Sequence, residues 1–435
     1  MRVPDWIADD RGGTPTVDDV DIRSLYTKTK YCVETADGWS LVISRYRPVP
    51  QAFPQPIFGE PLLLVHGFSQ NRHAWTSGEF VKNLLFFGAD IHILELRGHG
   101  KSSIELQKER AKRFGRPLPR DIDYDWDIDS YFLYDLPAAV KGVKRITRRS
   151  KLFYCGHSMG GILAYGYAGI HRDFEGLITI GSPADLGRGF LPLRALALSA
   201  PVLGYAIDLA YGSFNLNRRV RQLSARLLSS AMRHLLGREP EVDVAAEQLA
   251  RLRFRYVPLD TWFRYLERSL GAAELNPYLG KLVEKLNLLS NLDRVGADDI
   301  HWLLREGGEK EPRKVIEQFA RWIRRRELVC YRTGYDFKRG FPKITIPMAI
   351  IFGDLDPLAS VESTRSVYRA AQSEYLLWRP VKGNSHIELT MGHDIRQICY
   401  DIKNLVEYAR VHRTRSPSLP RLDRRGTVRQ IRSVE

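Results

Sequence analysis

The sequence predicts an α/β fold in which a mostly parallel central sheet carries helices on both faces and receives a helical cap as an insertion. Short apolar runs alternate with helix-like segments in two separate parts of the 435-residue chain, which is the order of βαβ units. Between those parts lies a long stretch that is rich in Leu, Arg and Ala and contains no such runs. Hydrophobic residues make up 44% of the chain, which is enough for a large core.

The predicted strands of the parallel sheet are continuous apolar runs, as expected of strands that are buried on both faces. They are PLLLVHG (61–67), ADIHILEL (89–96), KLFYCG (151–156), GLITIGS (176–182), MAIIFG (348–353) and YLLW (375–378). Ahead of them, residues 31–47 predict a hairpin around a tight turn at Asp37-Gly38. The helix-like segments between the runs are FVKNLLFF (80–87), YFLYDLPAAVKGV (131–143) and ILAYGYAGI (162–170).

This organisation divides the chain into five segments. They are a loosely packed N-terminal lead-in (1–29), the first part of the core (30–185), the helical cap insertion (186–340), the second part of the core (341–411) and a basic tail expected to be disordered (412–435).

Two stretches support the helical reading of the insertion. Residues 218–236 place leucines on one helical face and arginines largely on the opposite face. Residues 190–212 are more apolar, but Arg194 and Asp208 interrupt them. We therefore interpret this stretch as a pair of cap helices that lines a pocket, in preference to a membrane anchor.

The chain has a formal net charge of +15, and most of it lies in two segments. Residues 186–340 have 27 basic against 18 acidic side chains, and residues 413–435 have seven Arg against two acids. Such a basic surface favours peripheral contact with an anionic membrane or an anionic substrate. A surface that only keeps the protein soluble is the alternative.

The cysteines and the N-terminus bear on the compartment. Cys32, Cys155, Cys330 and Cys399 form no CxxC pair, which argues against a zinc site and a disulfide framework and favours a reducing compartment. The first residues contain no apolar h-region, and no uncharged apolar run of 18 residues occurs. We therefore expect neither a signal peptide nor a membrane-spanning helix, and a cytoplasmic location.

The strongest chemical motif is Gly156-His157-Ser158-Met159-Gly160, a GxSxG pattern. It directly follows an apolar run and directly precedes a helix-like segment, which is the strand–turn–helix setting of a nucleophile elbow. A serine on such a sharp turn has strained dihedrals, so the residues two before and two after it must lack side chains. The pattern predicts Ser158 as a nucleophile at the start of a helix, where the dipole favours negative charge.

A serine nucleophile needs a base, and the base needs an orienting carboxylate, which follow in the order Ser, acid, His. We favour Asp356 as the acid, because it lies three residues beyond the strand that ends at Gly353. Asp354 stays open as the alternative and is otherwise expected to cap the loop. Asp185, after the run at 176–182, is a third candidate.

The expected base is His386, in the glycine-containing loop that follows the last predicted strand. It comes 30 residues after Asp356, which leaves room for one helix and one strand. His393 opens the following helix and is expected to be a surface or capping residue.

Two backbone N–H groups are needed to stabilise the oxyanion of an acyl-transfer intermediate. Met159, directly after the serine, is expected to supply one, and Phe68, in the loop after the first parallel strand, the other. His66 is expected to be structural. Gly100-Lys101-Ser102 resembles the end of a phosphate-binding loop, but Glu95 stands where that motif needs glycine. We predict no metal and no cofactor.

Several motifs together resemble the α/β-hydrolase superfamily. They are His66-Gly67-Phe68, Arg97-Gly98-His99-Gly100-Lys101-Ser102, Gly156-His157-Ser158-Met159-Gly160-Gly161 and Gly353-Asp354-Leu355-Asp356. VETADGWSLVISRYRP and YDLPAAVKGV resemble the acid-lipase branch of this superfamily. The segment GNSHIELTMGHDIRQICYDIKNLVEYA is similar to the C-terminal histidine region of that branch and of polyhydroxyalkanoate synthases. The resemblance covers about 30–185 and 340–411.

The departures from these families are informative. Polyhydroxyalkanoate synthases use a cysteine nucleophile, so Ser158 favours hydrolysis over polymer synthesis. Haloalkane dehalogenases and epoxide hydrolases of this fold use an aspartate in the elbow, which the serine disfavours. Animal acid lipases are secreted, whereas no signal peptide is expected here.

Together the residues and the resemblance imply a serine carboxylic-ester hydrolase, similar to lipases and esterases, that forms an acyl-enzyme through Ser158, His386 and Asp356. A large apolar cap implies a hydrophobic acyl ester as substrate. An acyltransferase, a peptidase or amidase, and a non-catalytic protein that binds lipid or nucleic acid through its basic cap remain alternatives. We expect no nucleic-acid partner, and the sequence does not indicate the oligomeric state.

Overall fold

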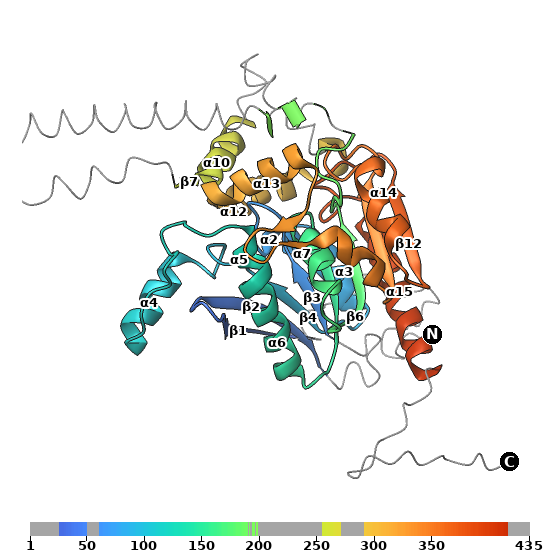
Figure 1. The fold of residues 1–435 in the computed structure, drawn as a ribbon, viewed down its shortest axis with the longest axis horizontal. Helices are drawn as coiled ribbons and strands as arrows, with labels where there is room; N and C mark the ends of the chain where they lie inside the picture. The colour runs from blue at the N-terminus through green and yellow to red at the C-terminus, as the bar shows by residue number, and fades with distance from the viewer. Residues whose placement is uncertain are drawn as a thin grey trace, which may run out of the picture.

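The computed structural model describes residues 26–49, 61–189, 255–270 and 291–415, together with residues 191, 194, 195, 197 and 198. An eight-stranded sheet runs through the molecule in the order β1-β2-β4-β3-β5-β6-β11-β12 (Figure 1). The pairs β1·β2 and β2·β4 are antiparallel, and all later pairs are parallel. The strands are β1 (Tyr26–Glu34), β2 (Ser40–Pro48), β3 (Leu62–Val65), β4 (Ile91–Leu94), β5 (Leu152–His157), β6 (Phe174–Ile180), β11 (Met348–Gly353) and β12 (Leu376–Val381).

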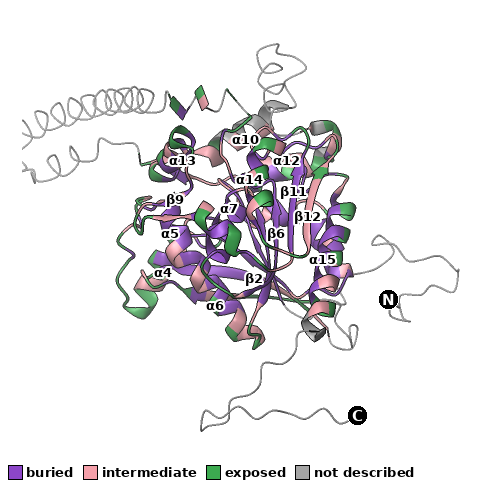
Figure 2. Cartoon of the chain, turned by 45° about the vertical axis from the view of Figure 1, so that its right-hand side comes forward, coloured by how far each residue is buried: buried purple, intermediate pink, exposed green. Residues whose placement is uncertain are grey.

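The central strands are apolar on both faces because each face has its own core. Along β5, Leu152 and Tyr154 point into one hydrophobic cluster, whereas Phe153 and Cys155 point into the other. β11 alternates in the same way. Successive side chains of a strand point to opposite faces, so a continuous apolar run is what a doubly covered strand needs. Figure 2 shows the central strands of the sheet buried inside the molecule.

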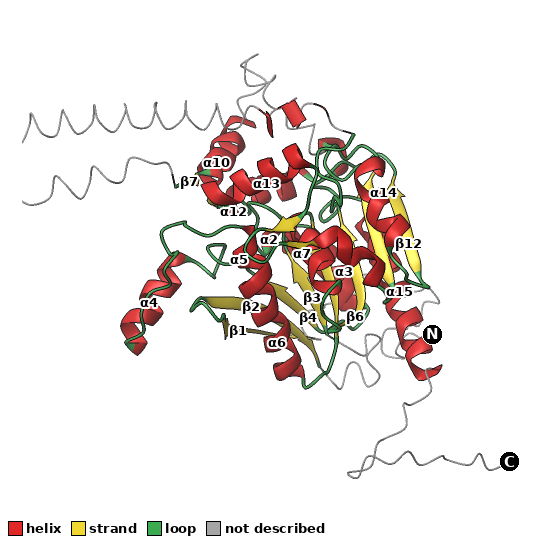
Figure 3. Ribbon diagram, in the orientation of Figure 1, coloured by secondary structure: helices red, strands yellow, loops and turns green. Residues whose placement is uncertain are grey.

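Helices cover both faces of the sheet (Figure 3). The cluster on one face includes residues of α2 (His73–Thr76), α3 (Phe80–Phe86) and α15 (Ile395–Arg415). The cluster on the other face includes residues of α5 (Ile128–Ser130), the π-helix η2 (Tyr131–Asp135), α6 (Leu136–Thr147), α7 (Met159–Ala168) and α14 (Val361–Ala370). The helix α4 (Ile104–Phe114) stands off the edge of the molecule near β1 and β2 (Figure 1).

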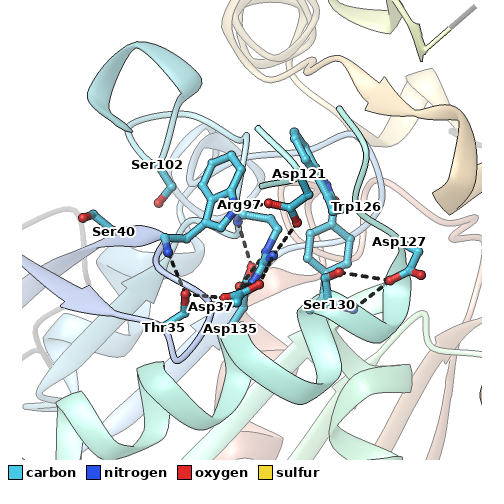
Figure 4. A network of polar contacts seen from close by, with 12 residues as sticks. Thr35, Asp37, Ser40, Arg97, Ser102, Asp121, Trp126, Asp127, Ser130 and Asp135 are labelled. Carbon is cyan, nitrogen blue, oxygen red and sulfur yellow. Dashed lines mark hydrogen bonds and ion pairs between the residues drawn. The ribbon is translucent and has the colours of Figure 1, made fainter. Parts of the chain in front are cut away.

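A buried arginine joins four segments of the first half of the chain (Figure 4). The Arg97 guanidinium, fully buried after β4, contacts carboxylates of Asp37 at 2.6 Å, Asp121 at 2.8 Å and Asp135 at 2.6 Å. Asp121 also accepts a hydrogen bond of 2.7 Å from Trp39 Nε1. Burial alone would lower the pKa of Arg97, but the carboxylates, Asp135 foremost, raise it above its ordinary value, so the guanidinium remains charged.

The described part of the insertion between β6 and β11 is mainly helical. Its elements are β7 (Tyr256–Val257), α10 (Leu259–Leu270), η3 (Leu292–Arg294), α12 (Ala297–Glu306), β8 (Glu311–Pro312), α13 (Arg313–Arg325), β9 (Val329–Cys330), β10 (Tyr335–Asp336) and η4 (Phe337–Lys343). Figure 1 shows α10, α12 and α13 together at one end of the sheet. The buried residues Val315, Trp322 and Phe337 belong to the main hydrophobic cluster, so the last part of the insertion packs as part of the core.

Two predicted boundaries are corrected. The lead-in expected at 1–29 ends earlier, because β1 begins at Tyr26, which pairs with Pro48. The tail expected at 412–435 begins later, because α15 continues to Arg415, and the His412 ring stacks on Tyr408 with centroids 3.8 Å apart. The predicted helices at 190–212 and 218–236 lie largely or wholly outside the described residues. In the part of the chain that is described, no helix has the length and apolarity to cross a membrane.

Candidate active site

Ser158 occupies a strained corner between β5 and α7. Its φ of 50° and ψ of −116° are unusual for a residue with a side chain. The neighbouring glycines permit this turn. A Cβ on Gly156 would lie 2.5 Å from Gly161 N, and a Cβ on Gly160 would lie 2.4 Å from Val65 O. The glycines of the motif are therefore required by close backbone approach, and Ser158 sits at the N-terminus of α7.

The structure brings Ser158, His386 and Asp356 together in one chain of hydrogen bonds. His386 Nε2 lies 3.0 Å from Ser158 Oγ, and His386 Nδ1 lies 2.7 Å from Asp356 Oδ2. The loops that follow β11 and β12 carry Asp356 and His386, so the three side chains meet where parallel strands end. This arrangement lets the imidazole take a proton from the serine while the carboxylate holds the other ring nitrogen.

Backbone N–H groups of its own loop hold the Asp356 carboxylate in place. Its second carboxylate oxygen accepts hydrogen bonds from Leu358 N at 2.8 Å and Ala359 N at 2.9 Å. The side chain is buried, and so is His386. Burial disfavours a charged imidazole, but the Asp356 carboxylate outweighs this effect and raises the pKa of His386 above its ordinary value.

The other candidate residues lie elsewhere. Asp354 is exposed and accepts a hydrogen bond from Gly383 N at 2.7 Å, so it holds the loop after β12, as a capping residue would. Asp185 pairs with Lys338. His393 is exposed just before α15, where its backbone N–H donates to Arg294 O at 3.0 Å.

The loop after β3 lies directly against the serine. A Cβ on Gly67 would lie 2.9 Å from Ser158 Cβ, so only glycine permits this approach. Gly67 N donates to Gln70 Oε1 at 3.0 Å. The half-buried Phe68 ring packs edge-to-face on Phe319 of α13, with centroids 5.6 Å apart. Phe68 therefore lies in the segment beside the serine, and Met159 begins α7; their convergence on a reacting oxygen stays a prediction.

His66 has structural contacts. Its Nδ1 lies 2.9 Å from Gly67 O, and Leu96 N donates to its Nε2 at 3.2 Å. One nitrogen donates and the other accepts, so the ring is neutral. Burial and the neighbouring His99 lower the pKa of His66 well below its ordinary value, in agreement with this assignment.

Two further residues, which the sequence motifs do not mark as functional, hold the loops of the site. His157 lies between the two loops, with Nδ1 2.9 Å from Gln70 Oε1 and Nε2 3.2 Å from His386 O. Burial, and then His386, lower the pKa of His157 to about 3, so it is neutral. The buried Glu388 accepts N–H groups of Ser385 and of Asn291, which joins the histidine loop to the insertion. Sequence offered a signal only for His157, which lies within the GxSxG motif.

Among the described residues, no group of three or more His, Cys, Asp or Glu side chains is arranged to hold a metal ion.

Comparisons with known proteins agree on one family. The sequence profile described as the alpha/beta hydrolase fold matches residues 60–385. The chain is 26% identical over 183 residues to a probable lipase of Schizosaccharomyces pombe, covering 40% of this chain and 38% of that protein. It is 25% identical over 210 residues to the lipase lipl-3 of Caenorhabditis elegans, covering 46% and 51%. It is 23% identical over 144 residues to the human lysosomal acid lipase/cholesteryl ester hydrolase, covering 32% and 34%.

The match thus spans about a third to a half of the length of these relatives. Among solved structures, the monoacylglycerol lipase of Paleococcus ferrophilus superposes with a TM-score of 0.46 at 13% identity, covering 88% of this chain and 99% of that chain.

Proposed function

Because the chain belongs to the α/β-hydrolase fold family, we propose that it is a serine carboxylic-ester hydrolase that acts on esters of hydrophobic acyl groups. The observation that carries the proposal is the hydrogen-bonded chain from Ser158 through His386 to Asp356. This set of residue types, on a strained turn at a helix N-terminus, is suited to nucleophilic attack on a carbonyl.

The proposed reaction has two acyl-transfer steps. In the first, His386 accepts the Ser158 proton as Oγ attacks the ester carbonyl, and the imidazolium then protonates the leaving alcohol. In the second, His386 takes a proton from water, which attacks the acyl-enzyme and releases the acid. Asp356 stabilises the imidazolium in both steps. Phe68 and Met159 are the proposed N–H donors to the oxyanion.

A hydrophobic acyl group is supported by the surroundings of the serine and by the relatives. Phe68 follows Gly67, whose backbone lies against Ser158, and the Phe68 ring packs on Phe319, which provides aromatic surface at this loop. Several curated relatives are named as lipases, and one as a cholesteryl ester hydrolase. Hydrophobic pockets gain affinity from apolar area, so turnover should rise with acyl length until the pocket is filled.

The first test is covalent labelling of the full-length protein with a fluorophosphonate probe, followed by mass spectrometry of the modified peptide. We expect the label on Ser158, and its absence in Ser158→Ala. Hydrolysis of p-nitrophenyl esters from acetate to palmitate should fall by about 10⁴-fold or more in Ser158→Ala and in His386→Ala.

The matched control is His393→Ala, which removes an exposed histidine seven residues from His386 and should leave turnover unchanged. A folded wild-type protein that takes no label would contradict the proposal and favour a non-catalytic binding role. Transfer of the acyl group to an added alcohol in preference to water would identify an acyltransferase.

The proposal includes peripheral contact with an anionic membrane and a cytoplasmic location. The end of α4 supports the first part: Phe114 is 51% exposed and Leu118 is 44% exposed, and Lys112, Arg113 and Arg116 are exposed around them. Apolar side chains flanked by basic ones suit an interface with anionic headgroups. The free thiols of all four cysteines support a reducing compartment.

A further inference from the structure

Two glutamates of the insertion, near the start of β8, bind the loop after β3 by hydrogen bonds. Ser69 N–H donates to the Glu311 carboxylate, and Ser69 Oγ donates to Glu309 O at 2.8 Å. Glu309 N in turn donates to Ser69 O at 3.1 Å. The Glu309 carboxylate accepts Asn71 Nδ2 at 2.6 Å and Gly100 N at 2.9 Å. Every polar group of Ser69 is therefore bound to this part of the insertion.

Glu311 is paired with a second buried charge. His99 Nε2 lies 3.2 Å from Glu311 Oε1, and His99 Nδ1 lies 2.8 Å from Arg97 O. Both partners are acceptors, and an imidazolium, which has a proton on each ring nitrogen, can donate to both at once. Burial opposes this charge, but Glu311, and after it Glu309, raise the pKa of His99 to about 9. Both side chains are fully buried, so this ion pair has no competition from water.

These contacts determine how the neighbouring peptide groups point. The Gly67 carbonyl is bound by His66 Nδ1, and the N–H and C=O of one planar peptide unit point in opposite directions. The N–H of Phe68 therefore faces away from His66. The next peptide unit, between Phe68 and Ser69, is oriented by Glu311 through Ser69 N–H. Phe68 N–H thus belongs to a peptide unit whose carbonyl is bound by His66, and the peptide unit directly after Phe68 is held by Glu311.

We propose that Glu311 is a positioning residue for the esterase reaction: with His99, it holds Ser69 and thereby keeps Phe68 N–H aimed at the oxyanion. The inference rests on the proposed function and assigns part of the insertion a role in turnover as well as in covering the site. Ser69 supports it by its own backbone, since a φ of 56° is a left-handed conformation that a serine adopts only when held.

The test compares Glu311→Ala, which removes the acceptor, with Glu311→Gln, which keeps an acceptor oxygen but not the charge facing His99. We expect kcat for p-nitrophenyl butyrate to fall about 30- to 100-fold in Glu311→Ala, with KM changed by less than about threefold, because an oxyanion donor acts mainly in the transition state. The kcat of Glu311→Gln should lie between those of the wild-type protein and Glu311→Ala, about tenfold below wild type. The matched control is Glu317→Ala on α13, whose glutamate pairs with Arg313 at the surface.

A second readout does not depend on enzymatic activity. Hydrogen–deuterium exchange of peptides covering residues 66–72 should quicken at least tenfold in Glu311→Ala, while β5 and β11 stay protected. If the wild-type protein took no fluorophosphonate label, the proposed function would fail. Faster exchange of residues 66–72 in Glu311→Ala would still show that Glu311 holds this loop. The inference would be overturned if Glu311→Ala kept both the kcat and the hydrogen–deuterium exchange rates of the wild-type protein. Faster exchange throughout the molecule would also overturn it, because Glu311 would then be a general stabilising residue.

Discussion

In the proposed reaction the imidazole of His386 must be neutral to accept the Ser158 proton, so its pKa is expected to set the acid limb of the pH–rate profile. Burial favours the neutral ring, but Asp356 reverses the balance and raises the pKa above 6.5. Because protonation removes the base, we expect kcat/KM to fall as the pH drops through this raised pKa, with a midpoint above 6.5. Initial rates with a soluble ester between pH 5 and pH 9 measure it.

Replacing the Asp356 carboxylate with an amide measures its contribution to the rate of the proposed reaction. In Asp356→Asn we expect kcat to fall by roughly 10³- to 10⁴-fold, and the acid limb to move to lower pH, because the charge that favours the imidazolium is gone. Asp354→Asn is the control, since the Asp354 carboxylate accepts a hydrogen bond from Gly383 N and Asp354 lies outside the Ser158–His386–Asp356 chain. Equal losses in the two variants would contradict our assignment of the acid.

The sequence could point to the three central residues because each follows a recognisable apolar run. The greater distance of Asp356 from the strand end favours it over Asp354, and the structure places Asp356, not Asp354, beside His386. Glu311 and Glu388 could not be found in this way. Their partners are distant along the chain or lie in loops without a periodic pattern, and a buried carboxylate in such a segment looks like any surface acid.

Among the elements, α4 combines features that secondary structure alone does not explain. Its last residue, Phe114, is exposed, and the guanidinium groups of Arg110, Arg113 and Arg116 lie 5.3 to 5.6 Å from the ring centroid. Basic residues in the last turn complement the helix dipole, but an exposed aromatic ring gains nothing from that effect. The end of α4 is therefore the surface that we propose for membrane contact, where aromatic insertion and attraction to anionic headgroups would act together.

We expect the full-length protein to sediment with vesicles of phosphatidylserine and phosphatidylcholine but not with phosphatidylcholine alone. Arg113→Glu should weaken binding about tenfold or more, since each basic residue near such a surface contributes about 1 kcal/mol. Phe114→Ser should weaken it as well. Arg339→Glu makes the same change of net charge at a residue whose side chain is 86% exposed on η4, and should leave binding unchanged. Equal effects of Arg113→Glu and Arg339→Glu would indicate that only overall charge matters.

The elements of the core were predictable where burial enforces a pattern. All six predicted parallel strands are present, and the hairpin around Asp37-Gly38 is confirmed. The start of β1 and the end of α15 were misplaced because pairing with β2 and ring stacking within α15 extend elements past the change in composition. The predicted resemblance to acid lipases is confirmed by the similarity to curated lipases. The remaining segment boundaries stay predictions.

At the scale of the whole molecule, Arg97 links the β1–β2 turn, the segment before α5 and the π-helix η2. Replacing it with methionine would leave three carboxylates facing one another in a buried site. We expect Arg97→Met to lower the free energy of unfolding by about 3–5 kcal/mol, measured by urea denaturation. Arg264→Met, which removes a surface ion pair with Asp260 on α10, should change it by less than about 1 kcal/mol. A small change in Arg97→Met would mean that the network adds little to stability.

The insertion touches both loops that flank the serine: Ser69 through Glu311, and the histidine loop through Asn291, whose side chain also donates to Gly383 O at 2.9 Å. A chimera that exchanges all of residues 186–340, in search of a new acyl preference, would lose the contacts that hold both loops. A chimera that exchanges only residues before 291 keeps these contacts. It is the design in which an active enzyme with a changed acyl preference should be sought.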